Sequence, residues 1–311
     1  MTSSADSLAM PESPQNPDSP DLDGTVSWRA LLTETEILLE RSGKSDNPGR
    51  EARWIMEEVT GTTGAEFAEA LDGLATTRGV AHLDALVARR SGGEPIQYVL
   101  GHWAFRSIDV LVDRRVLIPR PETEIVAGLA LDELDRLCPN GEGTAVDLGT
   151  GSGVIGLSIA VERPNSRVLM TDKSRDALAV ARANLAGIGL AARGVEIAEG
   201  SWFQAVPDRY KEQCDVIVSN PPYVAPDDVL DDSVADWEPE SALRATERGL
   251  HDLLHIVDRA GGWLRPRGAL VLELGATQAG EIVAHGERNG YQCSVHQDLA
   301  GLDRAVILRV G

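Results

Sequence analysis

Aromatic side chains, cysteines and long apolar runs are all scarce in this chain of 311 residues. Phe, Trp and Tyr together make up 4% of it, so each of the six tryptophans is worth locating. The three cysteines lie far apart and form no CxxC pair, which indicates a reduced, cytoplasmic chain rather than a disulfide framework. No apolar run approaches the roughly 18–20 residues of a membrane helix, and the N-terminus lacks a signal-peptide pattern. We therefore expect no membrane partner.

Basic residues are also few, with 29 Lys and Arg against 49 Asp and Glu, and the net charge is −20. Binding of a duplex or a long RNA depends on neutralising phosphates with Lys and Arg, so we expect no stable nucleic-acid partner. A locally basic groove is not excluded. His251-Asp252-Leu253-Leu254-His255 resembles a zinc-protease pattern, but Asp is one methylene shorter than the required Glu. We predict no metal site and an ordinary helix face there.

The composition changes along the chain and divides it into four parts. Residues 1–25 are rich in Ser, Pro and Asp and carry no Lys or Arg, which predicts a disordered acidic tail. Residues 26–92 show apolar stripes at helical spacing, such as Ala52, Ile55 and Met56, and predict a small helical domain. Residues 93–120 are predicted to form a β-hairpin linker, and 121–311 the main domain.

From Thr144 onward, strand patterns alternate with helix patterns. This alternation predicts a largely parallel, doubly wound α/β sheet. The expected strands are Thr144–Leu148, Arg167–Thr171, Val195–Ala198, Asp215–Ser219, Ala269–Leu274, Tyr291–Val295 and Ala305–Val310, and the expected helices are Ile125–Leu137, Val154–Val161, Arg175–Gly187, Leu243–Ala260 and Gln278–Asn289.

A glycine turn follows the first expected strand of the sheet. It reads Gly149-Thr150-Gly151-Ser152-Gly153 and opens a helix, and Asp172 ends the next strand, where a carboxylate can accept hydrogen bonds from ribose hydroxyls. The GxGxG spacing differs from the GxGxxG of dinucleotide folds. It resembles class I S-adenosylmethionine-dependent methyltransferases, in which the acid of the first strand, here Asp147, is a candidate for contacting the ammonium of the cofactor, directly or through water.

A second motif, Asn220-Pro221-Pro222-Tyr223, ends another strand at the same expected edge of the sheet. The prolines stiffen the loop and turn it away from the sheet. The carbonyl oxygens of Asn220 and Pro221 can both accept hydrogen bonds from one planar NH2 group, and Tyr223 offers a flat stacking face. The motif restricts the methyl acceptor to a glutamine amide or an adenine or guanine amine, and it does not choose among them.

Five ordered motifs together resemble the HemK/PrmC family of protein-glutamine methyltransferases, over residues 27–311. The resemblance implies a class I methyltransferase (Rossmann-like) domain with a seven-stranded, mostly parallel sheet, a helical N-terminal domain for substrate recognition and a β-hairpin linker. The motifs are Glu94–Gly101, Val116–Glu124, the glycine turn, Asn220–Tyr223 and Gln297–Arg304.

The same resemblance implies a reaction and a set of residues. The reaction is methylation of the glutamine in the Gly-Gly-Gln motif of class I peptide chain release factors, the protein partners. The resemblance also implies which residues hold S-adenosylmethionine, with Trp202 beside the adenine. These are Gly149–Gly153, Asp172, Trp202 and Asn220. Asn220 would also touch the substrate, with Pro221, Pro222 and Tyr223 completing the glutamine pocket. Arg120 and Glu122 match the family's linker motif near the active site.

Three alternatives stay open: a glutamine methyltransferase acting on a ribosomal protein, an adenine or guanine methyltransferase acting on nucleic acid, and a cofactor-binding module without turnover. One departure from the family concerns Arg244–Arg248, where many members carry a Gly-Gly pair, and it affects one expected pocket wall.

An acidic group follows the Asn-Pro-Pro-Tyr loop and either forms a solvated loop or guides a basic partner segment. Its members are Asp227, Asp228, Asp231, Asp232 and Asp236.

Overall fold

The computed structural model describes residues 26–225, 232–244 and 249–311. The predicted tail, the acids Asp227, Asp228 and Asp231, and most of the Arg244–Arg248 segment lie outside these residues. The chain divides into two compact units, Met1–Gly93 and Glu94–Gly311, and the contacts place the hairpin within the second unit. None of the described helices is long and apolar enough to cross a bilayer.

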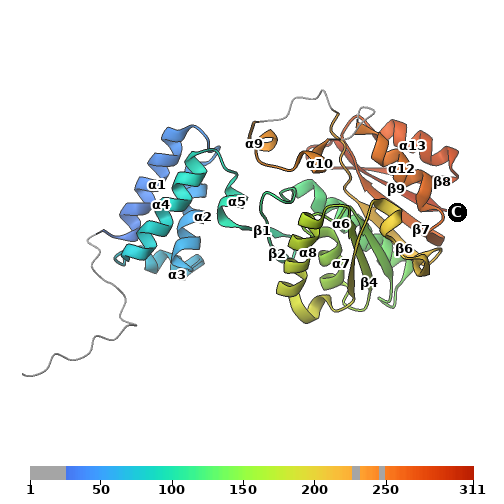
Figure 1. Cartoon of the computed structure of the whole chain (residues 1–311), viewed down its shortest axis with the longest axis horizontal. Coiled ribbons are helices and arrows are strands. Elements are labelled where there is room, and N and C mark those ends of the chain that lie inside the picture. The colour runs from blue at the N-terminus through green and yellow to red at the C-terminus, as the bar shows by residue number, and fades with distance from the viewer. Residues whose placement is uncertain (1–25, 226–231, 245–248) are drawn as a thin grey trace, which may run out of the picture. The chain divides into compact units, whose positions relative to one another are not determined.

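The first unit is helical, as its apolar stripes predict (Figure 1). Ser27 caps its first helix by accepting a hydrogen bond from the Ala30 N–H at 3.3 Å. Ala52, Ile55 and Met56 are fully buried, which confirms the predicted stripe. Its helices are α1 (Trp28–Ser42), α2 (Pro48–Thr60), α3 (Gly64–Ala70) and α4 (Thr77–Ser91).

The second unit begins with α5 (Ile96–Leu100) and an antiparallel hairpin of β1 (His102–Phe105) and β2 (Ile108–Leu111). Its sheet has the strand order β5-β4-β3-β6-β7-β9-β8, in which β9 alone runs against the others. The fold class predicted from the alternating pattern is therefore confirmed. The strands are β3 (Thr144–Leu148), β4 (Arg167–Asp172), β5 (Val195–Glu199), β6 (Cys214–Ser219), β7 (Leu264–Glu273), β8 (Tyr291–Gln297) and β9 (Asp303–Val310).

Helices cover both faces of this sheet (Figure 1), so its central strands are buried on both sides. In β6, Val216 and Val218 pack into the core beneath α6, α7 and α8, whereas Ile217 packs into the core beneath α12 and α13. Successive side chains of a strand point to opposite faces, and this explains the uninterrupted apolar runs of the sequence. The helices are α6 (Pro121–Leu137), α7 (Val154–Glu162), α8 (Arg175–Ile188), α9 (Asp232–Ala235), α10 (Glu240–Leu243), α12 (His251–Ala260) and α13 (Ala279–Arg288), with short 3₁₀ turns at Gly189–Ala192, Trp202–Ala205 and Asp208–Tyr210.

The prediction of one helix over Leu243–Ala260 is wrong, because α10 ends at Leu243 and α12 begins only at His251. Gly249, between them, has a φ of +80°, which interrupts a right-handed helix. A Cβ on Gly249 would lie 2.0 Å from the Tyr223 carbonyl oxygen. Only glycine therefore lets the chain pass so close to the Asn-Pro-Pro-Tyr loop.

The strand predicted at Ala269 begins earlier, at Leu264. The register between β6 and β7 shifts between Cys214 and Val216, and Arg267 has a φ of +67°. This bulge hides the first half of the strand from a simple alternation pattern.

Asn184, a buried residue of α8, ties the hairpin to the glycine turn. Its Oδ1 accepts from the Leu111 N–H at 2.7 Å, and its Nδ2 donates to the Leu111 and Ser152 carbonyls at 3.1 and 2.8 Å. The side-chain amide of Asn184 therefore provides hydrogen-bond partners both for the backbone of Leu111 in β2 and for the Ser152 carbonyl in the turn.

We expect Asn184→Ala to destabilise the protein by about 1–3 kcal/mol, because buried backbone groups lose their partners. Chemical denaturation monitored by circular dichroism measures this loss. Arg182→Ala, at an exposed position of the same helix, is the matched control. Equal stabilities of the two variants would contradict the anchoring role.

Candidate active site

Four strand ends meet at one edge of the sheet, because β4, β3, β6 and β7 are parallel and in register. Leu148 pairs with both Thr171 and Ser219, and Ser219 pairs with Leu272. The next residue of each strand therefore stands in one row at the carboxyl edge, where open α/β sheets bind ligands. These four residues are Asp172, Gly149, Asn220 and Glu273.

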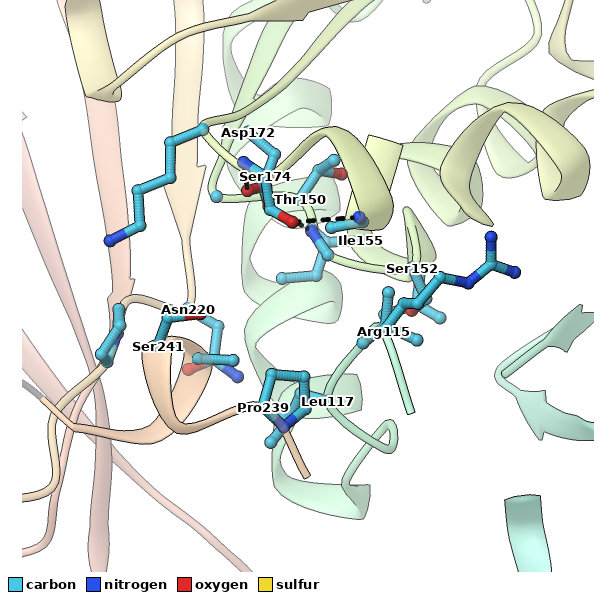
Figure 2. Close-up of a pocket in the computed structure, with 18 of the residues that line it drawn as sticks. Arg115, Leu117, Thr150, Ser152, Ile155, Asp172, Ser174, Asn220, Pro239 and Ser241 are labelled. Carbon is cyan, nitrogen blue, oxygen red and sulfur yellow. Dashed lines mark hydrogen bonds between the residues drawn. The ribbon is translucent and has the colours of Figure 1, made fainter. Parts of the chain in front are cut away.

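A pocket opens at this edge in the second unit, and most of the predicted site residues line it (Figure 2). Gly149, Thr150, Gly151, Ser152, Asp172, Trp202, Asn220 and Pro222 border it. Three predicted residues, Gly153, Pro221 and Tyr223, are not among its lining residues. Gly153 instead precedes α7 as its N-cap residue, with a φ of +92°. Pro221 and Tyr223 belong to the same loop as Asn220 and Pro222, which do line the pocket.

Asp172 is held at the pocket by two backbone N–H groups (Figure 2). Its Oδ2 accepts from Gly151 at 2.9 Å and its Oδ1 from Ser174 at 2.8 Å. Each carboxylate oxygen keeps a further lone pair, so the side chain can still accept hydrogen bonds from the two hydroxyls of a ribose. The contact with Gly151 also couples the end of β4 to the glycine turn after β3.

Asp147 does not line the pocket, so the structure gives no support for its direct contact with a ligand. The residue is buried, and its Oδ2 accepts from Thr150 Oγ1 at 2.5 Å and from the Gly156 N–H at 3.0 Å. Burial raises the pKa of Asp147 to about 6, against the lowering effect of these two bonds. The carboxylate therefore fastens the glycine turn to α7.

Trp202 covers the glycine turn and has the unusual φ of +47°. A Cβ on Gly149 would lie 3.2 Å from its ring, so glycine lets the indole lie against the backbone. The indole Nε1 donates to Asp252 Oδ1 at 3.2 Å. No local pattern in the sequence points to this role of Asp252, which stands within the His-Asp-Leu-Leu-His segment.

The Asn-Pro-Pro-Tyr loop leaves β6 directly after Ser219, whose Oγ donates to the Leu148 carbonyl at 2.6 Å. Asn220 Nδ2 donates to Thr123 Oγ1 at 3.2 Å. The Tyr223 hydroxyl donates to Glu273 Oε1 at 3.3 Å, and the Tyr223 carbonyl accepts from Gln278 Nε2 at 2.9 Å. Burial raises the pKa of Tyr223, so its hydroxyl stays protonated and remains a donor.

The linker before α6 forms another wall of the pocket, which includes Arg115, Leu117 and Arg120. Buried Glu238 holds this wall by accepting from the Ile118 N–H at 3.0 Å and from the Arg120 guanidinium. Glu122, which the resemblance placed near the active site, is not among the lining residues.

The wall after Glu238 is only partly described. Pro239, Ser241 and Ala242 line the pocket, and Arg244 Nη1 donates to the Ala225 carbonyl at 2.9 Å. The rest of the departure at Arg244–Arg248 lies outside the described residues, and the expected change in wall shape stays a prediction.

The pocket suits S-adenosylmethionine in the chemistry of its donors and acceptors. Asp172 offers acceptors for a ribose, Trp202 an aromatic face, and the turn between β3 and α7 backbone amides. Seven strands in this order, with one reversed strand near the edge, are the fold of the class I methyltransferases, enzymes that use S-adenosylmethionine.

Comparison with known proteins identifies the family. Residues 30–101 match the PrmC N-terminal domain and residues 128–238 the methyltransferase small domain. The release factor glutamine methyltransferase of Salmonella typhimurium is 40% identical over 249 residues, which is 79% of this chain and 86% of that protein. Those of Aliivibrio fischeri and Geobacter sulfurreducens are each 35% identical over 91% of this chain, and the matches cover 97% and 96% of those proteins. The chain belongs to the release factor glutamine methyltransferase family, which confirms the resemblance to HemK/PrmC.

The raised pKa of Asp147 predicts a specific dependence of stability on pH. The folded value of about 6 exceeds the ordinary value of 3.8, so the protonated form is favoured in the folded state. The wild type should therefore lose about 3 kcal/mol of stability relative to Asp147→Asn as the pH rises from below 4 to above 6. Urea denaturation of both proteins across this range tests the effect. A stability difference that does not vary with pH would refute it.

Proposed function

We propose that this enzyme transfers the methyl group of S-adenosylmethionine to the side-chain amide nitrogen of the glutamine in the Gly-Gly-Gln motif of class I peptide chain release factors. The similarity to release factor glutamine methyltransferases supports this choice of substrate. The observation that carries the chemistry is the hydrogen bond from Asn220 Nδ2 to Thr123. It leaves the carbonyl end of the Asn220 amide as an acceptor at the pocket wall.

The cofactor is proposed to lie along the carboxyl edge of β3 and β4. The turn formed by Gly149, Thr150, Gly151, Ser152 and Gly153 would hold its methionine half by backbone amides. Asp172 would accept hydrogen bonds from the ribose, Trp202 would cover the adenine, and Asn220 would border the methyl group. Gly153 contributes through the conformation of the turn, since it does not line the pocket.

The substrate amide is proposed to bind against the loop after β6. The side-chain carbonyl of Asn220 and the backbone carbonyl of Pro221 would accept from its NH2 group, while Pro222 and Tyr223 confine its plane. An amide nitrogen is a weak nucleophile because its lone pair is delocalised, so alignment with the methyl group supplies much of the rate. A carbon–nitrogen bond forms as the carbon–sulfur bond breaks, the sulfonium becomes a neutral thioether, and the nitrogen proton leaves to water. The carbonyl oxygens stabilise the positive charge that develops on the nitrogen.

The helical domain, residues 26–92, is proposed to recognise the release factor, and residues 93–120 to link it to the methyltransferase domain. We place the reaction in the cytoplasm, where translation ends. The acidic group that follows the Asn-Pro-Pro-Tyr loop, Asp227, Asp228, Asp231, Asp232 and Asp236, would guide a basic segment of the partner.

Mass spectrometry of a purified release factor, after incubation with the enzyme and S-adenosylmethionine, tests the function directly. We expect one added methyl group on the motif glutamine, and none on a release factor whose glutamine is replaced by glutamate. A ribosomal protein and an oligonucleotide are offered as alternative substrates in separate, parallel reactions. Methylation of either in place of the release factor would overturn the proposal, and so would cofactor binding without transfer to any of them.

Asn220→Ala should lower kcat about 10²–10³-fold, because the developing charge loses an acceptor in the transition state. The affinity for S-adenosylmethionine, measured by calorimetry, should change much less. Parallel loss of turnover and of cofactor affinity would contradict the role given to Asn220.

Asp252→Ala should weaken S-adenosylmethionine binding about tenfold, because the Trp202 indole loses the acceptor that orients it. Asp252→Asn keeps an acceptor oxygen and should bind nearly as the wild type does. Asp258→Ala, at an exposed position of the same helix, is the control for nonspecific effects. Calorimetry that finds Asp252→Ala and Asp258→Ala alike would exclude the positioning of Trp202 by Asp252.

A further inference from the structure

Glu273, the last residue of β7, is a carboxylate with no exposed surface at all. A buried carboxylate is costly unless hydrogen bonds compensate it. In the described part of the chain its partners are two hydroxyl groups: Thr123 Oγ1 donates to Oε2 at 2.7 Å, and the Tyr223 hydroxyl donates to Oε1 at 3.3 Å. Thr123 lies in the first turn of α6, and Tyr223 lies in the Asn-Pro-Pro-Tyr loop.

The direction of these hydrogen bonds is dictated by the carboxylate. An ionised carboxylate has no proton to donate, so the single hydroxyl proton of Thr123 must point to Glu273. The Thr123 oxygen can then only accept from Asn220, at 3.2 Å. An Asn amide carries donors on its nitrogen and acceptors on its oxygen, so the nitrogen end must face Thr123 and the oxygen end must face away from it.

We propose that Glu273 is a positioning residue that sets the polarity of the Asn220 amide through Thr123. The inference rests on the proposed function, in which Asn220 accepts a hydrogen bond from the substrate NH2 group. With the amide reversed, Asn220 would present its own NH2 group to the NH2 of the substrate, and the two donors would repel each other. Through its other oxygen, the same carboxylate also holds the Tyr223 side chain.

The arrangement makes the amide sensitive to protonation. Burial raises the pKa of Glu273 to about 7, against the lowering effects of Thr123, Tyr223 and the Arg304 charge, and the Glu122 charge raises it further. The ionised form predominates above this value and the protonated form below it. A protonated Glu273 can donate to Thr123, which frees the Thr123 proton to point to Asn220 and allows the amide to turn. Activity should therefore fall as the pH drops through about 7.

Thr123 offers a matched pair of variants for the first test. Thr123→Val keeps the shape of the side chain without its hydroxyl, and Thr123→Ser keeps the hydroxyl. We expect Thr123→Val to lower kcat at pH 8 about tenfold or more, with unchanged affinity for S-adenosylmethionine, whereas Thr123→Ser remains near the wild type. Wild-type turnover by Thr123→Val would overturn the proposal.

The pH profile of kcat separates positioning from a merely structural role. In the wild type kcat should rise through an acid limb near pH 7, and in Glu273→Gln that limb should disappear, because a glutamine does not titrate. Asp147 also has a raised pKa, so persistence of the limb in Glu273→Gln would assign it elsewhere and refute the proposal. If Glu273→Gln does not fold, the Thr123 pair still decides.

An NMR measurement that needs no substrate distinguishes failure of this inference from failure of the proposed function. With asparagine labelled with ¹⁵N, the side-chain NH2 signals of Asn220 should titrate near pH 7 in the wild type. The titration should be absent in Thr123→Val and retained in Thr123→Ser. If release factors are not methylated while this titration is seen, the proposed substrate is wrong and the positioning stands. If the Asn220 signals do not respond to pH, the positioning is wrong whatever the substrate.

Discussion

The parallel pairing of four strands is the constraint on which the active site depends. Because β4, β3, β6 and β7 run in one direction and in register, their last residues reach the same edge of the sheet together. Asp172, Gly149, Asn220 and Glu273 thus stand in one row, although about a hundred positions separate Asp172 from Glu273. Helices on both faces bury these strands and hold the row rigidly. The loops that follow can then differ in chemistry without disturbing one another.

Carboxylates at this edge are held mainly by hydroxyl and amide donors. Asp147 is held by Thr150 and the Gly156 N–H, Asp172 by two backbone N–H groups, and Glu273 by Thr123 and Tyr223. Such bonds fix the side chains without cancelling their negative charge. Of these three carboxylates, only Asp172 lines the pocket, together with the cationic side chains of Arg115, Arg120 and Lys173.

Sequence patterns predicted the structure best where a short motif is enough to specify the local conformation. The glycine turn, Asp172 and the Asn-Pro-Pro-Tyr loop all follow strands that their apolar runs reveal, and these motifs lie around one pocket. Patterns misled where a distant contact overrides local propensity. The segment after Leu243 has helical periodicity, yet Gly249 must approach the backbone of Tyr223, and the helix is broken there. The hydroxyl of Tyr223 also donates to buried Glu273, a contact that no local pattern indicates.

The amino-acid sequence by itself determined the fold class, the family and the two motifs that meet at the sheet edge, because hydrophobic periodicity and turn residues are local properties of the chain. It also determined that the charge balance opposes a nucleic-acid partner. Only the tertiary structure decided which carboxylates face the pocket and which make hydrogen bonds inside the protein. Asp147 stands next to the last residue of its strand and Asp172 ends the next strand, but burial and hydrogen-bond partners separate their roles. Thr123 and Glu273 are 150 positions apart, and no local pattern could pair them. Their contact exists because α6 packs on the sheet where β7 ends.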